Sequence, residues 1–123
     1  MPIPAAALRY RWSELPKDQP MALLERRRVV GQQAMISHVL LKKGCFVPTH
    51  AHFNEQFCCI QSGRLHFILG TENAAFREEF TLAAGEVLHL PSNVPHSAEA
   101  LEDTVVLDIF SPPSEKTGID RKD

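Results

Sequence analysis

The fold of this sequence is decided by the stretch Gly44-Cys-Phe-Val-Pro-Thr-His50-Ala-His52-Phe-Asn-Glu-Gln56-Phe-Cys-Cys-Ile-Gln-Ser-Gly63. His50 and His52 are two residues apart, so in an extended chain both imidazoles point to one face. Gln56 has the same parity and offers a carbonyl oxygen. Two neighbouring imidazoles make a poor apolar core unless a metal or another partner satisfies their nitrogens. The stretch therefore predicts a metal site built on β-structure.

A second stretch supplies a third imidazole, in the sequence Gly85-Glu-Val-Leu-His-Leu-Pro91-Ser-Asn93-Val-Pro-His96. Asn is the ordinary residue best able to replace Gly at positive φ, so a turn at Asn93 can form without glycine. Three imidazoles and one amide oxygen suit one divalent transition metal, which could be Ni, Fe, Mn, Zn, Co or Cu. The predicted ligands are His50, His52, Gln56 and His96, and the sequence does not choose among the metals.

Short apolar segments on both sides of these stretches predict an all-β fold. Nine prolines and six glycines divide the chain, and turns such as Ser62-Gly63 and Ala84-Gly85 break the apolar runs. Strands are expected at Glu25–Val30, Gln33–Lys42, Gln56–Gln61, Arg64–Leu69, Ala75–Leu82, Glu86–Leu90, Ser97–Ala100 and Thr104–Phe110. About eight short strands suit a closed barrel or a double antiparallel sheet, because both leave few exposed edges.

The chain is predicted to form one domain with two appendages. Its 123 residues, 44% of them hydrophobic, are enough to bury a core. Residues 1–20 contain no core of their own and are expected to form an extended arm. Residues 21–112 would form the barrel, and the polar residues 113–123 a loosely held tail.

Composition argues against several classes of partner. Thirteen basic and fifteen acidic residues give a net charge of -2, so the chain lacks the excess of positive charge that favours binding to nucleic acid. No apolar stretch approaches the roughly 20 residues that cross a bilayer, and the N-terminus does not read as a signal peptide. The three cysteines, Cys45, Cys58 and Cys59, lack metal-knuckle spacing and are interpreted as reduced. A cytoplasmic location is therefore expected.

Asp108 lies in Thr104-Val-Val-Leu-Asp108-Ile-Phe110, a run that is apolar on both faces and typical of a strand buried from both sides. Burying an unpaired carboxylate costs several kcal/mol, on the order of the known desolvation penalties. Asp108 therefore faces a polar cavity, pairs with a base such as Arg64, or sits at an exposed strand end with a structural role only. Phe110 has the same parity and would form the apolar wall of such a cavity.

The two histidine stretches resemble the motifs of the cupin family. The first family motif is Gly, five residues, His-x-His, three or four residues, Glu, six residues and Gly, and Gly44 to Gly63 fits it with Gln56 where Glu is usual. The second motif is matched at Gly85, Pro91 and His96 and altered at Asn93 and Ala100. The resemblance implies a single cupin double-stranded β-helix, or jelly-roll barrel, with a bound metal.

Within cupins, the sequence is most similar to small bacterial proteins of pectin and alginate degradation, which convert 4,5-unsaturated monouronates to linear keto sugars. The shared stretches are His50-Ala-His52-Phe-Asn-Glu-Gln56, Pro91-Ser-Asn-Val-Pro-His96 and Glu102-Asp-Thr-Val-Val-Leu-Asp108-Ile-Phe110-Ser-Pro. This likeness implies metal on His50, His52, Gln56 and His96. It also implies that Asp108 is the acid/base and that Phe110 lines the sugar site.

One departure leaves the substrate open. Those proteins carry an arginine shortly after Phe-Ser-Pro, where this chain has Ser114. Arg64 or Lys116 could bind the substrate carboxylate instead, although a lysine cannot reproduce a bidentate fork. The alternatives are a metal-dependent dioxygenase on a small molecule and a non-catalytic small-molecule-binding cupin.

Small cupins commonly pair by lending an N-terminal strand to a partner. The arm of residues 1–20 and the Arg-rich strand Glu25-Arg-Arg-Arg28 would suit this role. The resemblance therefore implies a symmetric homodimer that acts on a small molecule.

Overall fold

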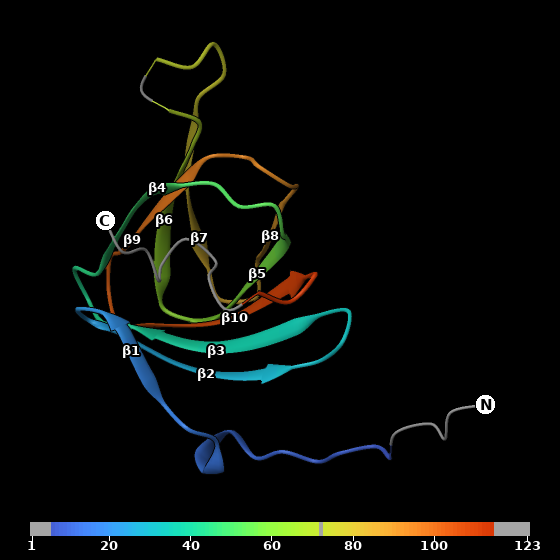
Figure 1. Cartoon of the computed structure of the whole chain (residues 1–123). Coiled ribbons are helices and arrows are strands. Elements are labelled where there is room, and N and C mark those ends of the chain that lie inside the picture. The colour runs from blue at the N-terminus through green and yellow to red at the C-terminus, as the bar shows by residue number, and fades with distance from the viewer. Residues whose placement is uncertain (1–5, 72, 115–123) are drawn as a thin grey trace.

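Two antiparallel sheets face each other in the computed structural model, which describes residues 6–71 and 73–114 (Figure 1). The larger sheet has the strand order β1-β2-β3-β10-β5-β8, and the smaller has the order β4-β9-β6-β7. The strands are β1 (Asp18–Met21), β2 (Leu24–Val30), β3 (Met35–Leu41), β4 (Phe46–His50), β5 (Glu55–Ser62), β6 (Arg64–Leu69), β7 (Glu78–Ala83), β8 (Val87–Leu90), β9 (His96–Ala100) and β10 (Thr104–Ser111). The prediction of an all-β jelly-roll barrel is confirmed.

The core lies between the two sheets and follows from the alternation of side chains along each strand. In β10, Val106 points inward and pairs with Val39 of β3 and Ile60 of β5. The buried apolar cluster draws on both sheets and comprises Leu24, Val39, Leu41, Cys45, Val47, Cys58, Ile60, Leu65, Phe67, Leu82, Ala98, Ala100 and Val106. Burying each large side chain of this kind is worth about 1.5–3 kcal/mol, so the cluster holds the sheets together.

Two strands are missed by the sequence prediction, β1 and β4, and for the same physical reason. Each lies at the edge of its sheet and contains a proline, Pro20 in β1 and Pro48 in β4. Proline lacks the backbone N–H that an inner strand needs, so it weakens the sequence signal of a strand and is tolerated at an edge. Because β1 begins at Asp18, pairing starts inside the segment 1–20 that we expected to be an arm.

Turn residues with positive φ support the two histidine stretches. Asn93 has φ 66°, as expected for an asparagine that replaces glycine. Gly63 has φ 88°, and a side chain there would collide with the carbonyl oxygen of Asp103. The backbone N–H of Asn93 donates to the carbonyl oxygen of His52 at 2.8 Å, which ties the turn before His96 to the loop that carries His52.

The N-terminal segment leaves the barrel beneath β2 and extends outward (Figure 1). A 3-10 turn, η1 (Trp12–Glu14), rests on the chain's own larger sheet. The Trp12 ring lies 5.3 Å from the His38 ring of β3, and Arg27 Nη1 donates to the Trp12 carbonyl oxygen at 2.8 Å. Residues 6–11 are exposed, and most of the predicted tail, residues 115–123, lies outside the described residues.

An ion pair between buried Arg26 and half-exposed Asp18 ties β2 to β1. Arg26 is 3% exposed, and its Nε and Nη2 atoms donate to Oδ1 and Oδ2 of Asp18 at 3.1 and 2.7 Å. These hydrogen bonds, with the charges of Arg26 and Arg28, hold the pKa of Asp18 below its ordinary value. The two bonds are charge-assisted, and such bonds contribute more than bonds between neutral groups.

We predict that Asp18→Ala lowers the free energy of unfolding by about 1–3 kcal/mol at pH 7, because it removes the carboxylate that pairs with buried Arg26. The lowered pKa of Asp18 makes its contribution complete above the unfolded pKa of about 3.9. The contribution is lost as the pH falls through the folded value, so the two proteins should converge below about pH 4. Urea unfolding measures this. The control is Glu25→Ala, which breaks an exposed pair with Lys17 and should cost under about 0.5 kcal/mol; equal losses in both variants would contradict the assignment.

Candidate metal centre

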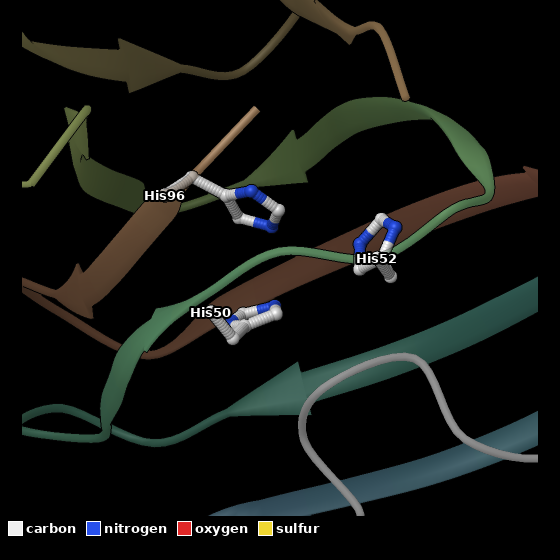
Figure 2. A group of neighbouring side chains, drawn as sticks. All are labelled: His50, His52 and His96. Carbon is white, nitrogen blue, oxygen red and sulfur yellow. The ribbon is translucent and has the colours of Figure 1, made fainter. Parts of the chain in front are cut away.

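Three histidines meet where β4 and β9 run side by side. His50 ends β4, His96 begins β9, and the two residues are cross-strand partners. His52 lies in the loop between β4 and β5, not in a strand as the spacing alone predicts. Figure 2 shows the three imidazoles gathered around a common space, and their ligand atoms all lie within 4.8 Å of one another. His52 therefore joins the other two histidines because its loop returns toward β9, and not because side chains alternate along a single strand.

Each of these imidazoles is oriented by a backbone carbonyl two residues away. The Nδ1 atoms donate to the carbonyl oxygens of Pro48 (from His50, 2.8 Å), Asn54 (from His52, 3.0 Å) and Val94 (from His96, 2.9 Å). A carbonyl oxygen can only accept, so Nδ1 carries the proton in each ring and Nε2 keeps its lone pair. This is the arrangement that metal-ligating histidines adopt, with one nitrogen held and the other turned to the metal.

Gln56 completes the group from the opposite sheet. Its Nε2 donates to Asp108 Oδ1 at 2.8 Å, and its Oε1 lies 3.0 Å from His52 Nε2. The carboxylate of Asp108 accepts, so the amide must turn its nitrogen to Asp108 and its oxygen to His52. Two acceptor atoms then face each other, the Gln56 oxygen and the His52 lone pair, and a cation or a proton between them is required. The four side chains therefore fit a divalent metal.

Burial sets the charge states around the group. It lowers the pKa of His96 to about 4, with a smaller contribution from the neighbouring His50. The ring is therefore neutral at physiological pH, as a metal ligand must be. Burial also raises the pKa of Asp108 to about 6, although hydrogen bonds from Gln56 and Cys58 oppose this rise. Asp108 is 9% exposed, so water solvates its carboxylate much less than it solvates a surface carboxylate.

A cavity of about 50 Å³ opens from this group into the barrel. Its polar end is formed by His50, Gln56, His96 and Asp108. The remaining lining is mostly apolar and comprises Leu24, Val39, Leu41, Val47, Cys58, Leu65, Phe67, Ala98, Val106 and Phe110. The Phe110 ring centroid lies 5.7 Å from that of His52, so Phe110 forms a wall beside the histidines, as the sequence predicts.

Arg64, which we expected to bind substrate or to pair with Asp108, pairs with Glu102 and does not line the cavity. Its side chain is 54% exposed, and its Nε lies 3.1 Å from Glu102 Oε2. In the register of β6 and β9, Leu69 faces His96 while Arg64 stands at the other end of β6, about 17 Å away along the strand. Arg64 is therefore removed from the candidate site, and Lys116 lies outside the described residues.

Two residues of the site escape the sequence prediction. Cys58 lies opposite Asp108 and lines the cavity, although the sequence indicates no role for it beyond that of a reduced cysteine. Its even spacing from Gln56 in β5 was the available signal, since both point inward. Asn54 is 5% exposed and joins the His52 loop to the chain after β10, by donating from Nδ2 to the Pro112 carbonyl oxygen. Nothing in its loop sequence indicates that contact.

The sequence matches the cupin domain family over residues 37–110, a span that includes all four predicted ligands. The chain therefore belongs to the cupin family. A comparison with curated proteins finds no match. No helix among the described residues is long and apolar enough to span a membrane.

Solved structures share this fold at low sequence identity. KdgF from Halomonas sp. is 22% identical with a TM-score of 0.79, over 89% of this chain and 97% of that one. An RmlC-like cupin from Shewanella frigidimarina is 21% identical with a TM-score of 0.78, over 89% and 95%. Oxalate decarboxylase from Bacillus subtilis, which has Mn(II) centres, is 19% identical with a TM-score of 0.80, over 94% of this chain and 33% of that one.

We predict about one divalent metal per chain in the untagged protein, and loss of that metal in a His50→Ala/His52→Ala variant, because two of the imidazole ligands are removed. Elemental mass spectrometry measures the metal content. The matched control is His66→Ala/His89→Ala, which removes two histidines that pair with Glu79 and Glu55 outside the cavity. Little metal in the wild type, even after a range of divalent ions has been added back, would mean that the histidines are structural.

Proposed function

We propose that this cupin is a metal-dependent enzyme that opens or isomerises a small sugar acid, such as a 4,5-unsaturated uronate, to its linear keto form. The observation that carries the proposal is Asp108, a buried carboxylate that lines the cavity and bonds to the predicted ligand Gln56. A proton-transfer group therefore stands directly beside a Lewis-acid site. The likeness of the Asp108 and Phe110 stretch to uronate-linearising cupins supports the same reaction.

A divalent ion held by His50, His52, Gln56 and His96 would polarise a ring or hydroxyl oxygen of the substrate. Ring opening is an isomerisation and needs no oxidant or reductant. A proton leaves the anomeric hydroxyl, the bond between the anomeric carbon and the ring oxygen breaks, and a proton is returned to C4, which gives an aldehyde and a ketone. Asp108 is the group that moves the proton, if it comes within hydrogen-bond reach of the sugar. Phe110 offers an apolar wall for the ring.

We predict that Asp108→Ala reduces turnover of a 4,5-unsaturated monouronate by at least about 100-fold at saturating metal, because general acid/base groups contribute about that much or more. The loss of the conjugated double bond, followed by ultraviolet absorbance, measures the rate. Glu102→Ala is the control, since it removes an exposed carboxylate that pairs with Arg64. Retained activity in Asp108→Ala would remove Asp108 from catalysis. Tight binding of the uronate with no product in the wild type would favour the non-catalytic binding module.

The size and lining of the cavity favour a second candidate, a metal-dependent dioxygenase. About 50 Å³ holds roughly four water molecules, and the mostly apolar wall suits a small apolar molecule such as dioxygen. Three imidazoles with open positions are also compatible with Fe(II). Removing oxygen distinguishes the candidates: turnover that persists without oxygen excludes the dioxygenase, and turnover that stops excludes ring opening as the main reaction.

We also propose that the protein is a symmetric homodimer that pairs through the outer face of the larger sheet. The central strands of this face present mainly apolar, partly covered side chains, with Glu25, Arg27, His38 and His89 beside them; the apolar side chains are Ile36, Leu40, Phe57, Val87, Val105, Leu107 and Ile109. The outer face of the smaller sheet is more polar, with His66, Glu79, Thr81 and Glu99 beside the apolar Ile68 and Phe46. A large apolar face without central charge is typical of a surface that a second copy covers.

We predict that Leu107→Lys converts this dimer to a monomer in sedimentation equilibrium, because it places a charge in the centre of the apolar face. The matched control is Ile68→Lys, which makes a similar change on the outer face of the smaller sheet and should leave the dimer intact. A wild-type protein that sediments as a monomer would count against the homodimer. An equal effect of both substitutions would count against this face.

A further inference from the structure

We infer that Asp108 determines which side chain can stand at position 56 and aims the oxygen of that side chain at the three histidines. In this role Asp108 is a positioning residue for the candidate metal centre, in addition to any part in proton transfer. The inference rests on the proposed function, because it takes His50, His52, Gln56 and His96 as the metal ligands. It goes further by explaining why the fourth ligand is a glutamine.

Geometry brings the two side chains together inside the barrel. In the register of β5 and β10, Asp108 faces Cys58 and Gln56 faces Phe110, so Gln56 and Asp108 are diagonal neighbours on the inner face. Their hydrogen bond is 2.8 Å, with Gln56 6% exposed and Asp108 9% exposed. Cys58 is the residue directly opposite Asp108 in this register, and it is buried beside the carboxylate.

Residue 56 has Asp108 on one side and His52 on the other, and these two neighbours limit which amino acid can stand there. Toward Asp108 it must donate, because a carboxylate only accepts. Toward His52 and the candidate metal it must present an oxygen, and Oε1 of Gln56 lies 3.0 Å from His52 Nε2. A primary amide does both, whereas the glutamate that is usual in cupins would place two carboxylates at hydrogen-bond distance in a buried site. Gln56 and Asp108 are therefore a matched pair.

The pair also changes where the negative charge of the site lies: it is on Asp108, one side chain away from the histidines, and not on residue 56. A glutamate ligand would bring its charge to the metal, whereas here the ligand is neutral and the carboxylate lies behind it on Asp108. If the amide turned over, its nitrogen would face His52 and the ligand would be lost. Hydrogen bonds behind metal ligands commonly determine affinity in this way, and their removal costs about 10–100-fold.

The first test is a double-mutant cycle in metal-free protein, prepared with a chelator at pH 8. Urea unfolding is compared among the wild type, Gln56→Glu, Asp108→Asn and the double variant, in which an asparagine at position 108 could donate to a glutamate at position 56 and restore the pairing. We expect Gln56→Glu to lower the unfolding midpoint when residue 108 is Asp, and to leave it unchanged or raise it when residue 108 is Asn. The matched control is Gln61→Glu, the same change at an exposed position of β5. Additive midpoint shifts would overturn the inference.

The second test is metal affinity, with Zn²⁺ and Mn²⁺ as the titrants. We expect Asp108→Asn to raise the Kd at least about 10-fold, because the Gln56 amide is no longer held. The double variant should recover most of that loss through its glutamate ligand. An Asp108→Asn protein that binds both metals within twofold of the wild type would overturn the positioning role. A wild type that binds neither metal would defeat the proposed function instead, and the metal-free cycle would still decide whether residues 56 and 108 form a matched pair.

Discussion

Polar groups inside an apolar barrel must be paired, and here they are paired mainly with one another. Asp108 accepts from Gln56, Gln56 lies against His52, and the His52 ring contacts the rings of His50 and His96. Backbone carbonyls orient the histidines from behind. Where the Gln56 oxygen meets the His52 lone pair, at 3.0 Å, a cation or a proton between the two acceptors satisfies both, and three imidazoles in reach make this a candidate metal site. The same pairing gathers these polar side chains at one end of the cavity, and that end is the candidate site.

Much of the architecture could be predicted because alternating apolar residues and glycine turns act locally. The same local rules fail at β1 and β4, where a proline hides an edge strand. They place His52 in a strand, although only the path of the chain between the sheets brings it back beside His96. Arg64 fails because strand register, which the sequence does not reveal, puts it at the end of β6 away from His96. Residue types and spacing predict the ligands, whereas distance across the barrel depends on register.

Family membership and chemistry carry different parts of the functional argument. The cupin match fixes the barrel and the position of the two histidine stretches, and the structural neighbours, all below 25% identity, support the fold. The choice of reaction depends on what is particular to this chain. The amide of Gln56 beside the histidines, the Asp108 carboxylate behind it and a small, mostly apolar cavity distinguish the site from a bare three-histidine group.

The four predicted ligands come from both halves of the molecule. His50 and His96 belong to the smaller sheet, Gln56 belongs to the larger one, and His52 lies on the loop between them. An ion bound by all four would therefore cross-link the two sheets at the histidine end of the barrel. Because such an ion would bind the folded chain and not the unfolded one, a higher metal concentration would lower the frequency of local unfolding at this end of the barrel. Metal supply would then govern the resistance of the protein to proteases as well as its chemistry.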